Sequence, residues 1–320
     1  MNRFLTLLLL SAASTFVAGS TALTQEAPPL WAYPVNPPDF KAPPDDGTLR
    51  HVPDSTASMT LTQVRDLFYA PDWHPGDHPP MPESVANGRK PSVYACGFCH
   101  RADGPGGPEN AYLMGLPAAY IVQQLADFKS GARKSSVQNR VPTQLKAKLA
   151  ADITDAEVQS AAAYFASVKP RTVIRVVETE LVPKTHVTAW FLSVANADEK
   201  EPIGERIIEV PENLQDFISR DTRTRFIAYV PTGSIEKGRA LATRSDQAVQ
   251  CVACHGPDLK GLGTVPGIAG RSPTYTLRQL YDFKHGARGG PDSAQMKPSV
   301  EKLSIQDMIS VSAYAGSLAP

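Results

Sequence analysis

Two five-residue stretches hold every cysteine of the chain and decide its fold: Cys96-Gly97-Phe98-Cys99-His100 and Cys251-Val252-Ala253-Cys254-His255. Both follow the pattern Cys-x-x-Cys-His, and the two copies lie 155 residues apart. Because the chain has only 4 cysteines, none remains for a thiol nucleophile or a lipid anchor. The repeated pattern must therefore account for all of the cysteine chemistry.

Cys-x-x-Cys-His is the attachment signature of c-type haem. Two thiols three positions apart on a helical turn can add to the two vinyl groups on one edge of the porphyrin. The next residue then presents its imidazole to the iron from the same side. The sequence predicts two covalently bound haem c groups. The predicted cofactor-binding residues are Cys96, Cys99, His100, Cys251, Cys254 and His255.

Two other interpretations of the cysteines explain less. A redox pair of the thioredoxin type would not need the histidine that follows each motif. A structural zinc site could use the four cysteines as its four ligands. That site would leave both histidines without a role and would require residues 155 apart to meet at one ion.

An internal repeat surrounds both motifs. Residues 120–133 match residues 275–288 at nine of fourteen positions, again with an offset of 155. Apolar residues at Ile121, Leu125 and Phe128 are three and four apart, which predicts a helix with one buried face. Gly131 follows where a helix would end. Each half therefore carries the same helix, which begins 24 residues after the first cysteine of its haem motif.

Further shared patterns complete each half. Capping-box patterns at 154–157 and 304–307 predict the start of a last helix. The segments 86–89 and 236–239 are predicted to belong to a first helix, whose glycine allows close packing against the last one. Each half is then a helix, the haem motif, a loop, a helix, a loop and a helix in about 90 residues.

This arrangement resembles a class I cytochrome c domain, and the whole chain resembles the tandem dihaem cytochromes c of the bacterial periplasm. The resemblance covers about 76–170 and 233–320. It implies a mainly α fold of two cytochrome c domains, and the residues between them predict a small β-rich connector. The expected organisation is a signal peptide at 1–22, a Pro-rich N-terminal arm at 23–75, domain 1 at 76–170, the connector at 171–232 and domain 2 at 233–320.

The resemblance also implies a methionine, from the loop before the last helix, as the second axial ligand of each iron. Met296 lies in that loop of the second half, eight residues after Arg288, and is predicted to ligate iron with His255. Thioether ligation raises the reduction potential. Met308 lies within the predicted last helix and is interpreted as a core residue.

The first half departs from this pattern. Val141 stands at the offset of 155 from Met296, and the loop is five residues longer. Between Arg133 and Tyr164 there is no Met, His or Cys; the loop offers Lys134, Asn139, Lys146 and Lys148. Elsewhere the possible ligands are Met81, Met114, His74, His78 and His186, of which Met114 is interpreted as packing. The first haem is thus predicted to be open on one side or capped by a distant residue, and the two haems to differ in potential.

Charge and the N-terminal sequence limit the location and the partners. Lys+Arg and Asp+Glu both number 32, which argues against a nucleic-acid partner and against a polybasic membrane-surface protein. Arg3, the apolar run that follows it and small residues at 18, 20 and 22 predict a secretory signal. The apolar run is shorter than the roughly 20 residues that span a bilayer. The sequence predicts a periplasmic protein without stable membrane insertion.

The segments outside the haem halves have their own character. Residues 23–82 contain thirteen prolines, which predicts an extended arm around the first half with a short helix near 61–69; a disordered tether is the alternative. In the connector, β-branched and aromatic residues predict strands at 172–177, 187–192, 205–210 and 225–230.

These features predict a soluble periplasmic carrier that passes electrons between redox proteins through weak, transient interfaces, rather than an enzyme. One alternative is a haem enzyme with an open first haem, either peroxidase-like or oxidising a sulfur compound. Another is the cytochrome subunit of a larger dehydrogenase. Arg133 and Arg288 recur at equivalent positions, where they could pair with haem propionates or face solvent.

Overall fold

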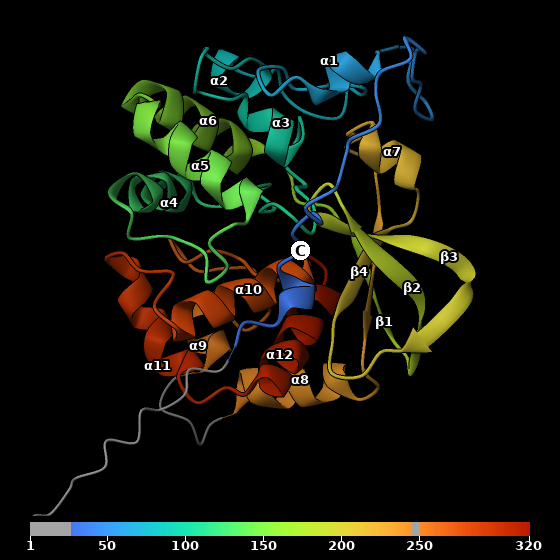
Figure 1. Cartoon of the computed structure of the whole chain (residues 1–320). Coiled ribbons are helices and arrows are strands. Elements are labelled where there is room, and N and C mark those ends of the chain that lie inside the picture. Colours follow the sequence, from blue (N-terminus) through green and yellow to red (C-terminus); the bar gives the residue numbers. More distant parts are fainter. Residues whose placement is uncertain (1–26, 245–249) are drawn as a thin grey trace, which may run out of the picture.

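The computed structural model describes residues 27–244 and 250–320 (Figure 1). The predicted signal peptide at 1–22 lies outside the described residues. Figure 1 shows two groups of helices stacked on each other, with the strands of the connector to one side of both. One hydrophobic cluster contains residues of both helical groups and of the connector, such as Phe165, Phe226 and Leu277.

The first helical half is built around its last helix. Its helices are α2 (Glu83–Ala86), α3 (Cys96–His100), α4 (Ala118–Ser130), α5 (Val141–Asp152) and α6 (Asp155–Ser167). Thr154 and Glu157 form the predicted capping box of α6. Helix α4 ends at Gly131, whose φ of 74° is the left-handed conformation that glycine favours. The segment predicted as a long loop before α6 contains the twelve-residue helix α5, which begins without a side-chain cap.

The second half carries α8 (Ser234–Thr243), α9 (Cys251–His255), α10 (Pro273–Lys284), the 3-10 turn η2 (Asp292–Met296), α11 (Lys297–Val300) and α12 (Ile305–Ser317). Ser304 and Asp307 form the capping box of α12. The predicted first helix is confirmed here as α8, but not in the first half. In the first half α2 ends before Asn87. Gly88 lies outside the helix, close to the backbone of Val93.

The connector forms two small sheets. In the first, β5 (Phe226–Val230) lies between the parallel β1 (Ile174–Glu178) and the antiparallel β4 (Ile208–Pro211). In the second, β2 (Leu181–Thr188) pairs with β3 (Phe191–Pro202). The predicted strand at 187–192 is wrong, because Ala189 and Trp190 both have positive φ and form the turn of this hairpin. The helix α7 (Leu214–Ile218) precedes β5.

The N-terminal arm contacts both halves. It includes the 3-10 turn η1 (Leu30–Ala32) and α1 (Leu61–Arg65), which is shorter than the predicted helix because Asp66 is extended. Tyr33 donates a hydrogen bond to Asp282 of α10 at 2.8 Å. Trp73 is buried and donates through Nε1 to the carbonyl of Ser219 in the connector. The backbone of Ala70 donates to the carbonyl of Ala86 in the first half. The arm therefore begins on the second half, which corrects the expectation that it wraps only the first.

Replacing Gly238 with alanine is expected to destabilise the second half. A Cβ at this position of α8 would overlap the carbonyl oxygen of Ser310 on α12, so the two helices would have to separate. Overpacking of this kind costs about 1–3 kcal/mol, partly offset by the better helix propensity of alanine. Thermal unfolding of the holoprotein measures the loss. Gly76→Ala is the control, because a Cβ at Gly76 would meet nothing within 4 Å; equal melting temperatures for the two variants would contradict the packing argument.

Candidate haem-binding sites

Each Cys-x-x-Cys-His motif forms a single helical turn, α3 or α9, that ends in a buried histidine. His100 Nδ1 lies 2.8 Å from the carbonyl oxygen of Ala111, and His255 Nδ1 lies 2.7 Å from that of Pro266. A carbonyl can only accept, so in both rings Nδ1 carries the proton and Nε2 keeps its lone pair. The partner follows the histidine by 11 residues in both halves. Both imidazoles are thereby oriented for ligation through Nε2.

The surroundings keep both imidazoles neutral. Burial, with a smaller contribution from the charge of Lys146, lowers the pKa of His100 to about 3. Burial also lowers the pKa of His255. Neutral imidazole is the form that binds a metal ion. The electrostatics therefore fit two histidines that ligate iron.

None of the four cysteines is disulfide-bonded to another, and Cys96 is buried. Burial raises the pKa of the Cys96 thiol to about 11. Within 27–244 and 250–320, no three His, Cys, Asp or Glu side chains gather closely enough to hold a metal ion. This geometry does not fit the zinc interpretation, in which the four cysteines would share one ion.

A reciprocal hydrogen-bond network joins the two halves. Arg133 and Arg288 form an antiparallel bridge, and each crosses to the other half. Arg133 donates to Gln124 of its own half, and across the boundary to Tyr275 at 2.9 Å and Gln279 at 2.8 Å. Arg288 donates to Gln279 of its own half, and across the boundary to Tyr120 and Gln124, both at 2.8 Å. Each residue has its equivalent at the offset of 155, so the halves pack with approximate twofold symmetry.

The charges in this network indicate whether it could hold the propionate groups of haem. The partners of both guanidinium groups are amide and phenol oxygens, which are formally neutral, and Arg288 Nε is buried without a partner. Burial alone would raise the pKa of Tyr275, but the two arginines bring it below its ordinary value. The buried Arg288, the partly buried Arg133 and an unsatisfied donor fit the carboxylates of haem propionates. The solvent-facing alternative for these arginines is wrong.

The methionines lie in different surroundings. Met296 is the last residue of η2 and is half-buried. It packs against a hydrophobic cluster that Cys251 also contacts. Met308 is fully buried in α12, as predicted, and Met114 is fully buried, which agrees with a packing role. Met81 packs against the cluster formed by Ala70, Ala95 and Phe98.

Three histidines proposed as distant ligands of the first haem lie in other contacts. His74 is buried, and its Nε2 lies 3.0 Å from Asp221. His78 contacts Asp72 through Nε2, and its Nδ1 lies 3.0 Å from the hydroxyl of Tyr164. His186 is exposed on the strand β2. The structure brings none of these three side chains to His100.

Lys146 does reach His100, although the sequence singles it out only as one of four polar side chains in its loop. Its Nζ lies 3.2 Å from His100 Nε2, the nitrogen left free for iron. Counting back from the capping boxes would have found it. Lys146 stands eight residues before Thr154, and Met296 stands eight residues before Ser304.

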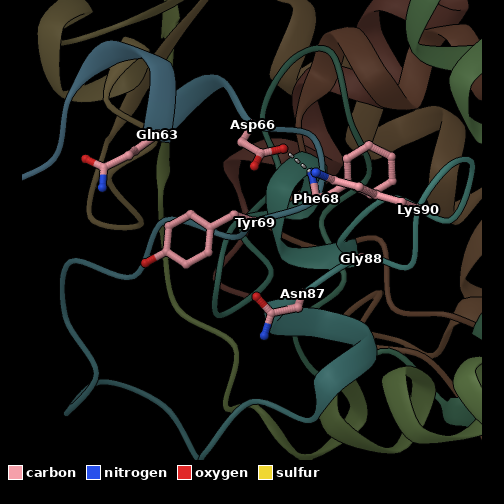
Figure 2. Close-up of a pocket in the computed structure, with 7 residues that line it drawn as sticks. All are labelled: Gln63, Asp66, Phe68, Tyr69, Asn87, Gly88 and Lys90. Carbon is pink, nitrogen blue, oxygen red and sulfur yellow. Dashed lines mark hydrogen bonds between the residues drawn. The ribbon is translucent and has the colours of Figure 1, made fainter. Parts of the chain in front are cut away.

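A surface pocket lies apart from these residues. Figure 2 shows its lining, which includes Gln63 of α1, Tyr69 and Lys90, and the hydrogen bond from the backbone of Phe68 to Asp66. None of the predicted haem-binding residues lines it.

Comparison with known proteins identifies relatives of both halves. The model of the Cytochrome c family matches residues 235–319. A thiosulfate dehydrogenase electron acceptor of Thiomonas intermedia is 27% identical over 207 residues, which are 62% of this chain and 67% of the relative. Cytochrome c4 of Azotobacter vinelandii is 25% identical and aligns over 68% of this chain and 82% of its own length. Cytochrome c-554(548) of Halomonas halodenitrificans is 36% identical over 77 residues, which are 24% of this chain and 93% of the relative.

Solved structures give weaker likenesses. The thiosulfate dehydrogenase TsdBA of Marichromatium purpuratum superimposes with a TM-score of 0.47 at 25% identity, over 71% of this chain and 37% of that chain. Cytochrome c4 of Pseudomonas stutzeri gives a TM-score of 0.44 at 22% identity, over 70% and 93% of the two chains. The family assignment therefore rests on the sequence matches.

The sequence matches define a c-type cytochrome that transfers electrons. The chain belongs to the dihaem cytochrome c family, and its cofactors are two covalently bound haem c groups. Its partners are redox proteins.

Proposed function

We propose that the chain is a periplasmic electron carrier whose two haems are attached to α3 and α9. The thioether-forming residues are Cys96, Cys99, Cys251 and Cys254. The proximal iron ligands are His100 and His255, and Met296 is the second ligand of the haem on α9. The observation that carries this assignment is the pair of equivalent hydrogen bonds from the Nδ1 atoms, which leave both Nε2 atoms available to iron.

The haem iron supplies a one-electron ferric/ferrous couple, and the chain sets the conditions for it. Two thioethers keep each cofactor in place after export. The backbone carbonyls of Ala111 and Pro266 fix the orientation of the imidazoles. Arg133 and Arg288 supply positive charge at the boundary between the halves, where it would balance propionates.

The donor that we propose is a dehydrogenase that passes electrons one at a time to this chain. Two of the relatives carry the name thiosulfate dehydrogenase electron acceptor, which supports this class of partner. No helix in the described residues is long and apolar enough to cross a membrane. The predicted signal peptide at 1–22 supports a carrier that meets its partners in the periplasm.

The double variant Cys96→Ser, Cys99→Ser is expected to carry one covalent haem per chain instead of two, because the first porphyrin loses both thioether bonds. The pyridine haemochrome assay and the intact mass of the purified protein measure the haem content. The matched variant Cys251→Ser, Cys254→Ser is expected to lose the other haem. Two haems retained in either variant would overturn the assignment of attachment sites.

A further inference from the structure

The residue that corresponds to Met296 in the first half depends on whether the halves are aligned by their haem motifs or by the starts of their last helices. From the haem motif, Met296 corresponds to Val141, which cannot bind iron. From the capping boxes at Thr154 and Ser304, Met296 corresponds to Lys146. The five extra residues of the first half therefore lie before this position, and Lys146 occupies the place of the methionine ligand.

The tertiary structure places the same residue at the iron-binding nitrogen. Lys146 lies on α5, and its half-buried side chain brings Nζ to 3.2 Å from His100 Nε2. The other ring nitrogen, Nδ1, is occupied by the carbonyl of Ala111. The amine thus lies where a ligand facing His100 across an iron would be needed.

Met81 packs beside Phe98 of the haem motif, and the other rival donors in the described part of the chain lie elsewhere. His74 pairs with Asp221, His78 contacts Asp72, and His186 is exposed. Met114 is fully buried, and its neighbour Gly104 packs against Phe165. Among these candidate ligands, Lys146 is the one whose donor atom contacts His100 Nε2.

We propose that the Lys146 amine is the second axial ligand of the haem attached to α3. The proposal rests on the assignment of that haem to His100. A metal–imidazole bond is about 2 Å long, so an iron between the two nitrogen atoms would need more room than their present separation of 3.2 Å. The flexible four-carbon stem of Lys146 would let the amine move back to make that room.

The donor atom sets the properties of the first haem. Lysine binds a metal as the neutral amine, so the ammonium group releases its proton on ligation. The soft sulfur of a thioether favours ferrous iron, whereas the nitrogen of a saturated amine does not. The haem on α3 should therefore have a lower potential than the haem on α9, and both irons should be six-coordinate.

The test compares Lys146→Met and Lys146→Ala with the wild type. Near-infrared magnetic circular dichroism of the ferric protein separates amine from thioether ligation. The wild type is expected to show one signal of each kind and Lys146→Met two thioether signals. In Lys146→Met the ferrous-to-ferric ratio of the first haem, measured at a fixed applied potential, should rise at least tenfold. For a one-electron couple this corresponds to an increase of about 59 mV in its reduction potential. Lys146→Ala should leave that haem open, so that the reduced protein binds carbon monoxide.

Lys148→Ala is the matched control, because Lys148 is exposed on the same helix; its spectra and potentials should equal those of the wild type. Two thioether signals in the wild type, or an unchanged spectrum in Lys146→Met, would overturn the proposal. Carbon monoxide binding by the reduced wild type to the α3 haem would also overturn it, and would favour an open catalytic haem. The pyridine haemochrome assay is run on every variant: fewer than two haems in the wild type would instead contradict the proposed attachment sites.

Discussion

Met296→Ala should keep both covalent haems but lose the high-potential wave in a redox titration. The thioether favours ferrous iron, and its removal leaves the haem on α9 with water or no sixth ligand. Axial ligands set haem potentials over a range of about 0.8 V, so a fall on the order of 0.1 V or more is expected. The same variant should bind carbon monoxide when reduced.

Met308→Leu is the control for this experiment. Met308 is fully buried in α12 of the same half, and leucine conserves most of its volume. Its potentials should stay at the wild-type values. If Met296→Ala also keeps them, another residue ligates the second iron.

Asp282→Ala should cause a larger loss of stability than any other substitution proposed for this chain. One oxygen of this buried carboxylate accepts from the hydroxyl of Tyr33 at 2.8 Å, and from the backbone and the hydroxyl of Ser136 at 3.0 and 2.7 Å. It therefore joins the arm, the loop after α4 and the helix α10. Without this carboxylate the backbone and hydroxyl of Ser136 lose their acceptor, and Tyr33 keeps only a longer contact with the carbonyl of Arg278 at 3.3 Å. A donor left without a partner costs about 1–3 kcal/mol, so the loss should be roughly 3 kcal/mol. The melting temperature should fall by about 6 °C or more.

The repeat supplies a matched control in Asp127, which stands at the offset of 155 from Asp282 and is also buried. Asp127 accepts from the side-chain amides of Gln123 and Gln124, both on its own helix. Asp127→Ala should therefore cost less than half as much. Equal losses for the two aspartates would show that the links between segments add nothing to stability.

The regular parts of the fold can be predicted from the sequence because their signals are local. The capping box at Thr154 marks the start of α6, and the repeat around Phe128 marks α4. The β-branched runs mark the connector, but strand bounds depend on pairing partners that are distant in sequence. For that reason the sequence predicts a strand across Ala189 and Trp190, which form the turn between β2 and β3.

The surface that the arm covers could not be predicted, for a related reason. Its prolines exclude regular structure but say nothing about which half they contact. Tyr33 contacts Asp282, 249 residues away, and neither residue carries a sequence signal for the other.

By itself, the sequence determined the chemistry: four cysteines in two haem motifs, each followed by a histidine, admit two attached cofactors. The tertiary structure decided which side chains meet around them. It brought Arg133 and Arg288 together across the two halves and placed the amine of Lys146 beside His100. A covalent motif acts through neighbours in the chain and can be recognised locally, whereas an axial contact depends on how α5 packs after an insertion, and only the folded backbone fixes that position.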